Sequence, residues 1–300
     1  MSARAFAIFS ALCCLATLLC ALATRAEPLA VVAAKSVRVA EPRARQFGEG
    51  LALPPELSGH TRHPLLHFTF DDGPDPVQTP RLLDALDAAG VKATFFFSAS
   101  RFLSGERRNA RAVELAREVA RRGHAIGSHS FDHQRMARLA PPALREQLAR
   151  NHAAFEHAFG RQSLLFRPPF GSSNRALRGM LRERGYSNVL WNIGLADWVE
   201  RPPQAIEETF FKVLARNERR DGDRGGIVLM HDTHAFSVDA FLLIMGELER
   251  RNCEALQQEH RPLYDVVDDL EPFAAEPDAR WLGDRQRRLR QRLQRSCSVR

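Results

Sequence analysis

Two histidines and two adjacent carboxylates are the side chains of this sequence best suited to bind a metal ion. His129 and His133 are four residues apart, so on a helical turn both imidazoles would face the same way, as in a divalent-metal pair. Asp71 and Asp72 are neighbours at the end of an apolar run, and their mutual repulsion needs a cation to offset it. Because adjacent side chains at a strand end diverge, one carboxylate could bind a metal while the other acts as a base.

A second histidine pair has the same spacing in a different context. The pair of His63 and His67 precedes the first predicted strand and lacks a following acidic partner, so we interpret it as incidental. His129 is not followed by Glu, which excludes the helical zinc-protease pattern. The chemistry at His129 therefore depends on which other residues the fold brings near it.

Short apolar strands alternate with helical segments from residue 65 onward. Strands are predicted at residues 65–70, 91–99, 124–128, 164–166, 188–193, 226–230 and 264–267. Helices are predicted at residues 80–89, 110–122, 141–159, 174–184, 204–217 and 239–259, and most of them end at a glycine. About seven strand–helix units predict an α/β fold whose parallel sheet closes, or nearly closes, into a barrel.

Polar residues follow these strands at their carboxyl ends. They are Asp71 and Asp72, His129, Arg167, Asp197 and Trp198, and His231 and Asp232. In a parallel barrel the carboxyl ends of the strands share one rim, where enzymes of this architecture place their active sites. The convergence of these residues, rather than any single pair, predicts a catalytic site.

Five motifs in the sequence resemble those of the polysaccharide deacetylases, the NodB-homology or carbohydrate esterase family 4 enzymes. They are, in chain order, Thr69-Phe70-Asp71-Asp72-Gly73-Pro74, His129-Ser130-Phe131-Asp132-His133, Arg167-Pro168-Pro169-Phe170-Gly171, Asp197-Trp198 and Leu229-Met230-His231. The matching stretch runs from residue 65 to residue 232. The resemblance implies a distorted (β/α)7-type barrel of the NodB-homology kind, and we expect a catalytic domain over residues 65–279.

The resemblance also implies a metal site. Asp72, His129 and His133 would bind one divalent metal ion. An Asp-His-His donor set suits Zn2+, with Co2+ and Ni2+ as alternatives.

A pair of proton-transfer groups is implied in the same way. Asp71 would be the general base and His231 the general acid, because amide hydrolysis needs an activated water and a protonated leaving amine. Arg167 would orient Asp71, and Asp197 would tune His231. From these charges we expect Asp71 to stay ionised and His231 to hold its proton.

The activity implied by the resemblance is removal of N-acetyl groups from an amino-sugar polymer: peptidoglycan, poly-N-acetylglucosamine or a chitin-type oligomer. The backbone N–H of Phe170 would stabilise the oxyanion together with the metal, and Trp198 and Leu229 would line the acetyl pocket. One alternative is the same metal site acting on O-acetyl esters or non-glycan cyclic amides. Another is a catalytically silent glycan-binding protein, against which the presence of both a base and an acid argues.

The composition and the N-terminus indicate an exported globular protein. The chain has 300 residues, of which 44% are hydrophobic and 26% charged, which excludes a disordered, collagen-like or multi-span membrane protein. Residues 1–26 have the features of a secretory signal, with Arg4 before an uncharged apolar stretch and small residues near its end. An uncleaved membrane anchor is the alternative. We expect a periplasmic, envelope-bound or secreted protein with residues 27–64 as a leader or linker.

The net charge of +7 is concentrated at the C-terminus. Residues 280–300 hold eight arginines and one acidic residue, and the rest of the chain is close to neutral. We therefore expect no nucleic-acid partner, because no base-reading module accompanies the charge. With Leu282, Leu289 and Leu293, this arginine-rich tail could form a basic amphipathic helix on an anionic envelope polymer or membrane surface, or remain a frayed tail.

Two cysteines lie outside the signal segment. Cys253 and Cys297 could form one disulfide in an exported chain, and the sequence leaves this pairing open. We expect a monomer.

Overall fold

The computed structural model describes residues 44–103, 107–258 and 263–297. The chain divides into two units, Met1–Val39 and Ala40–Arg300, and every described residue belongs to the second. The predicted signal segment lies outside the described residues.

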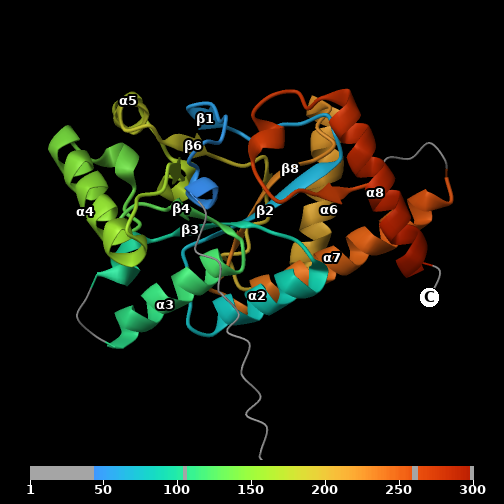
Figure 1. The fold of residues 1–300 in the computed structure, drawn as a ribbon, viewed down its shortest axis with the longest axis horizontal. Helices are drawn as coiled ribbons and strands as arrows, with labels where there is room; N and C mark the ends of the chain where they lie inside the picture. The colour runs from blue at the N-terminus through green and yellow to red at the C-terminus, as the bar shows by residue number, and fades with distance from the viewer. Residues whose placement is uncertain (1–43, 104–106, 259–262, 298–300) are drawn as a thin grey trace, which may run out of the picture. The chain divides into compact units, whose positions relative to one another are not determined.

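Within the described residues, nine strands form one parallel, curled sheet (Figure 1). They are β1 (Glu56–Leu57), β2 (Leu65–Asp71), β3 (Thr94–Phe97), β4 (Ala125–Ser128), β5 (Leu165–Phe166), β6 (Ser187–Val189), β7 (Ile193–Gly194), β8 (Gly226–His231) and β9 (Asp265–Val266). Their order is β1-β6-β5-β4-β3-β2-β8-β7, and β9 pairs with the beginning of β2. The parallel barrel-like α/β fold expected from the alternation of elements is confirmed.

The helices cover the outside of this sheet. They are α2 (Gln78–Ala89), α3 (Arg107–Arg121), α4 (Pro141–Phe159), α5 (Arg175–Glu183), α6 (Pro203–Asp221), α7 (Ala235–Leu256) and α8 (Ala279–Cys297). Phenylalanine rings fill the space between strands and helices: Phe68 of β2 lies edge-on to Phe241 of α7, with ring centroids 5.2 Å apart. Every residue of β2 is buried, as expected for a strand with neighbours on both sides and a covered face.

The described part of the segment expected as a leader, residues 44–64, is an integral part of the sheet domain. Strand β1 pairs with β6, and Phe47 in the short helix η1 (Ala44–Phe47) is only 1% exposed. These elements are two and four residues long. They are too short to produce the periodicity by which sequence patterns reveal secondary structure.

The single strand predicted at residues 188–193 is wrong, because the chain forms two strands there. Strand β6 pairs with β5 near one edge of the sheet, whereas β7 pairs with β8 at the other edge. Between them, the side-chain amide of Asn192 donates to the carbonyl of Gly225 and accepts from the N–H of Ile227. Residues 190–192 thus cross from β6 to β7, and within the described residues β1 at one edge does not pair with β7 at the other, so the barrel curls but does not close.

The arginine-rich tail forms helix α8 and is packed on the domain, so the frayed-tail alternative is wrong. Leu289 and Leu293 are buried in a cluster with Ala255 and Leu263. Arg285 donates two hydrogen bonds to Asp265 at the start of β9. The apolar face of α8 is therefore used within the protein and is not available to insert into a membrane.

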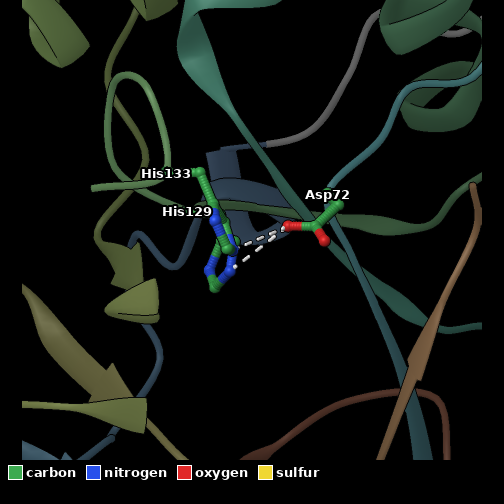
Figure 2. A group of neighbouring side chains, drawn as sticks. All are labelled: Asp72, His129 and His133. Carbon is green, nitrogen blue, oxygen red and sulfur yellow. Dashed lines mark ion pairs between the residues drawn. The ribbon is translucent and has the colours of Figure 1, made fainter. Parts of the chain in front are cut away.

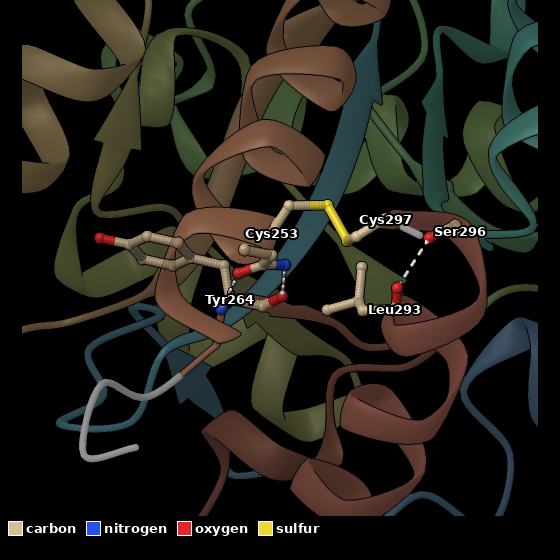
Figure 3. Close-up of a disulfide and its surroundings, with 6 residues drawn as sticks. Cys253, Tyr264, Leu293, Ser296 and Cys297 are labelled. Atoms are coloured by element: carbon tan, nitrogen blue, oxygen red, sulfur yellow. Dashed lines mark hydrogen bonds between the residues drawn. A yellow bond between two sulfur atoms is a disulfide. The ribbon is translucent and has the colours of Figure 1, made fainter. Parts of the chain in front are cut away.

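A disulfide between Cys253 of α7 and Cys297 of α8 also holds this helix, with the two Cα atoms 5.7 Å apart (Figure 3). The pairing that the sequence left open is thus formed. Within the part of the chain that the structure describes, no helix is both long and apolar enough to cross a bilayer.

Removing the disulfide should lower the thermal stability of the protein. The bond closes a segment of 44 residues, and limiting the freedom of such a loop in the unfolded chain contributes about 2–4 kcal/mol. We expect a lower Tm by calorimetry for the Cys253→Ser/Cys297→Ser double variant. A reductant should lower the Tm of the wild type and leave that of the double variant unchanged; equal Tm values for the two oxidised proteins would contradict the prediction.

Candidate active site

The sequence-predicted site residues lie at the carboxyl ends of adjacent strands. Asp71 ends β2 and is in register with His231, which ends β8. His129 follows β4, and its N–H donates to the carbonyl of Phe97 at the end of β3. Parallel pairing therefore gathers residues that are 160 positions apart in the sequence.

Asp72, His129 and His133 form a cluster suited to a metal ion (Figure 2). Oδ1 of Asp72 is 3.5 Å from Nε2 of His129 and 3.2 Å from Nε2 of His133. This oxygen is buried and has no hydrogen-bond partner among the described residues. One carboxylate and two imidazoles are a donor set that zinc and similar divalent ions accept, so the residues present fit such an ion.

His129 is held in the orientation and charge state of a ligand. Its Nδ1–H donates to the backbone carbonyl of Arg167 at 2.8 Å, which leaves Nε2 facing Asp72. Burial lowers the pKa of His129 to about 3, so the ring stays neutral. A carbonyl that accepts from the other ring nitrogen fixes the tautomer of metal-binding histidines in this way.

The Asp71 carboxylate is held by a buried guanidinium. Nη1 of the fully buried Arg167 donates to Oδ1 of Asp71 at 2.8 Å and to Oγ1 of Thr69 at 2.7 Å. Burial raises the pKa of Asp71, and the charge of Arg167 opposes that rise. Oδ2 of Asp71 remains directed at the cluster, 3.7 Å from Nε2 of His129.

On the other side of the rim, His231 is paired with the buried Asp197. Nδ1 of His231 is 3.0 Å from Oδ1 of Asp197, whose Oδ2 accepts from the backbone N–H of His231 and from the hydroxyl of Ser237. Burial lowers the pKa of His231, but the hydrogen bond and charge of Asp197 outweigh it and raise that pKa to about 9. His231 therefore keeps its proton at neutral pH.

Three predicted pocket residues surround these groups at different depths. Phe170 and Trp198 are each 54% exposed at the rim. The Phe170 ring lies edge-on to His133 with centroids 4.8 Å apart, and the Trp198 ring is 5.7 Å from that of His231. Leu229 is buried in β8, two residues before His231.

Two supporting residues escaped sequence reasoning. Ser237 lies in the first turn of α7, 40 residues after the Asp197 carboxylate it touches, and no motif links the two. Asp232, considered only as a general rim group, is fully buried and accepts a hydrogen bond from Thr79. A Cβ on Gly73 would lie 2.2 Å from Oδ2 of Asp232, so only glycine lets the loop after Asp72 pack there.

The other histidine pair lies away from this rim. His67 is fully buried in the middle of β2, where its ring nitrogens contact the carbonyl of Val267 and the hydroxyl of Thr94. His63 lies 2.6 Å from Glu276. The two rings therefore have separate structural partners.

One rim of the parallel barrel thus carries a metal-type cluster, an arginine-held carboxylate and a protonated histidine. This combination is typical of hydrolases that activate water. Residues 58–189 match the family described as polysaccharide deacetylase. A peptidoglycan-N-acetylglucosamine deacetylase of Bacillus cereus is 31% identical over 190 residues, which are 62% of this chain and 83% of that enzyme. The chain belongs to the polysaccharide deacetylase family.

A second relative is longer than this chain. The peptidoglycan-N-acetylmuramic acid deacetylase PdaC of Bacillus subtilis is 29% identical over 192 residues, 64% of this chain, but the match spans only 37% of PdaC.

Solved structures share the fold. A chitin deacetylase of the fungal pathogen Colletotrichum lindemuthianum superposes with a TM-score of 0.58 at 24% identity, covering 71% of this chain and 88% of that one. A family 4 pseudoenzyme from Bacillus anthracis superposes with a TM-score of 0.59 at 21% identity, covering 75% and 70%. An enzyme and a pseudoenzyme thus share this fold. Whether a protein with this fold is catalytic therefore depends on the side chains at its site.

The titration of His231 should depend on Asp197. In the metal-free protein, NMR should give a midpoint of about 9 for His231, and a lower midpoint in Asp197→Asn, because the main group that opposes the effect of burial is then removed. The His231–Asp197 pair makes its full contribution to the stability of the folded state below about pH 6.5. This contribution is lost as the pH rises through about 9. Glu200→Gln, which removes an exposed carboxylate three residues away, is the control; the same midpoint in Asp197→Asn and the wild type would contradict the assignment.

Proposed function

We propose that this protein is an exported, metal-dependent hydrolase that removes N-acetyl groups from an amino-sugar polymer. The observation that carries the proposal is the convergence of the Asp72-His129-His133 cluster, the Asp71–Arg167 pair and the His231–Asp197 pair at one rim. The named activities of the relatives, on peptidoglycan and on chitin, support the same substrate class.

Asp72, His129 and His133 would hold the metal ion, with Zn2+ preferred and Co2+ or Ni2+ as alternatives. The buried Asp72 oxygen without a hydrogen-bond partner among the described residues supports this assignment, because a buried carboxylate oxygen needs a positive or donating neighbour. When bound, the ion would act as a Lewis acid that polarises the amide carbonyl and lowers the pKa of a bound water towards about 7.

Asp71 would take the proton from the attacking water. Its Oδ1 is held by Arg167, which leaves Oδ2 on the side of the cluster for proton transfer. Arg167 would thereby orient the base.

His231 would give a proton to the leaving amine. Its Nδ1 is turned towards Asp197, and its Nε2 is 4.0 Å from Oδ2 of Asp72, on the substrate side. The backbone N–H of Phe170 would donate to the oxyanion, while Trp198 and Leu229 would line the acetyl pocket. The base and the acid would then lie on opposite sides of the carbonyl.

Two other functions remain as alternatives. The same groups could act on O-acetyl esters or cyclic amides, because the chemistry of water activation is shared. A silent glycan-binding protein is the alternative from a different class, since one protein of this fold is a pseudoenzyme. The complete and oriented set of base, acid and metal-type cluster favours the enzyme.

We also propose that the protein is exported and that α8 contacts anionic envelope components. A disulfide between Cys253 and Cys297 is typical of oxidising compartments, which supports export. Arg288, Arg292 and Arg295 are exposed on the side of α8 that does not carry its buried leucines, and anionic groups would offset their mutual repulsion.

Acetate release from peptidoglycan, poly-N-acetylglucosamine and chitooligosaccharides tests the proposed activity. We expect the zinc- or cobalt-loaded protein to release acetate from at least one polymer and the metal-free protein to release none. Asp71→Asn should retain the metal and lose about 10²- to 10⁴-fold in rate, the share of a general base. His129→Ala should lose the metal itself, measured by elemental analysis.

The controls separate the alternatives. O-acetylated glycans test the ester activity directly. Failure to bind any metal would contradict the assigned cluster, and equal rates for Asp71→Asn and the wild type would contradict the assigned base.

A further inference from the structure

Next to the metal-type cluster, the guanidinium of Arg135 lies over the exposed ring of Phe170. Its central carbon is 4.1 Å from the ring centroid. The same ring makes a T-shaped contact with His133, with centroids 4.8 Å apart, so three side chains in contact lead from a proposed metal ligand to the rim. A guanidinium stacked on a ring in this way keeps its in-plane N–H donors free for an anion.

No carboxylate among the described residues is paired with Arg135. Among the described residues, its side chain makes no hydrogen bond and no ion pair, and its contact is the Phe170 ring. Asp132, three residues earlier in the chain, makes no ion pair with Arg135: its Oδ2 accepts from the side-chain amides of Gln134 and Gln147, and its Oδ1 is buried without a hydrogen-bond partner among the described residues. By contrast, the charge of the buried Arg167 is matched by Asp71.

The backbone holds Arg135 in this position. The next residue, Met136, is fully buried, and the carbonyl of Arg135 accepts from the N–H of Arg138 at 2.9 Å. The side-chain amide of Asn174 donates to the carbonyl of Ala137 at 2.8 Å. The segment is therefore ordered before a ligand binds, which reduces the entropic cost of binding.

We propose that Arg135 and Phe170 form an anion-binding subsite that selects glycans with a carboxylate on or beside the N-acetyl sugar that reacts. The inference rests on the proposed function and narrows its substrate class. The carboxylate would accept from the Arg135 guanidinium, as planar carboxylates do, while the Phe170 ring packs against a sugar face. An amino sugar with a lactyl ether, as in N-acetylmuramic acid, has this chemistry, whereas N-acetylglucosamine does not.

Calorimetric binding of two tetrasaccharides tests the subsite. One is the neutral β-1,4-linked tetramer of N-acetylglucosamine; the other alternates N-acetylglucosamine with N-acetylmuramic acid bearing free carboxylates. All proteins are zinc-loaded and contain Asp71→Asn, so that turnover does not alter the ligand. Arg135→Gln should weaken binding of the anionic tetramer about ten-fold more than binding of the neutral one.

Arg138→Gln is the matched control, because it removes the same charge at an exposed position three residues away. We expect it to leave the ratio of the two affinities unchanged, and we expect salt to reduce the preference for the anionic tetramer. Equal weakening of both ligands by Arg135→Gln would mean that Arg135 only supports Phe170, and no weakening would mean that it does not touch the glycan. Either result overturns the subsite.

The proposed activity is tested separately in proteins that retain Asp71. If the anionic tetramer binds with the expected dependence on Arg135 but neither tetramer releases acetate, the subsite stands and the proposed deacetylation fails. If acetate is released but Arg135→Gln changes both ligands equally, the activity stands and the subsite fails.

Discussion

The buried guanidinium of Arg167 is the interaction on which the site depends. Its side chain donates to Asp71 and Thr69 of β2 and to the carbonyls of Val189 and Leu190 at the end of β6. Its own carbonyl accepts from the imidazole of His129. One residue thus orients the proposed base with its side chain and a proposed metal ligand with its backbone. A fully buried charge is costly unless it is paired and hydrogen-bonded, and here the partners supply both.

The carbonyls that accept from Arg167 lie where the chain leaves the sheet. Val189 is the last residue of β6, and Leu190 begins the crossing to β7 at the far edge of the sheet. The loops at the rim also carry backbone strain. Among the described residues, the non-glycine residues with positive φ are Asp72, Ser130, His133, Phe170 and Ala196. All five lie in or beside the predicted motifs, where strain of this kind is offset by the surrounding fold and serves to aim side chains.

The sequence is sufficient to predict the strands that carry the motifs and the residues that meet at the rim, because parallel strands place their carboxyl ends together. The predicted range of α4 agrees with the structure at both ends. Features that depend on tertiary contacts could not be predicted. The contact of Ser237 with Asp197 and the packing of Asp232 under Gly73 join residues that no local pattern relates.

Short or irregular elements were missed for a related reason. A two-residue strand such as β1 is too short to show a sequence period. The mostly apolar segment 188–193 has the pattern of one strand, although the chain crosses there from β6 to β7 on the other side of the sheet. The leucines of the C-terminal helix indicate an apolar face, but only the structure shows that this face packs on Ala255 and Leu263. The sequence pattern identifies which side chains are buried, but it does not identify the residues against which they pack.

A crystal structure of the zinc-loaded protein, with the metal located by anomalous scattering, tests the central claim most directly. We expect one ion bound by a carboxylate oxygen of Asp72 and by Nε2 of His129 and His133, at about 2.0–2.2 Å. Asp71 should remain on Arg167, outside the coordination sphere. An ion held by other residues, or an Asp71 carboxylate that leaves Arg167 to bind the ion, would contradict the account.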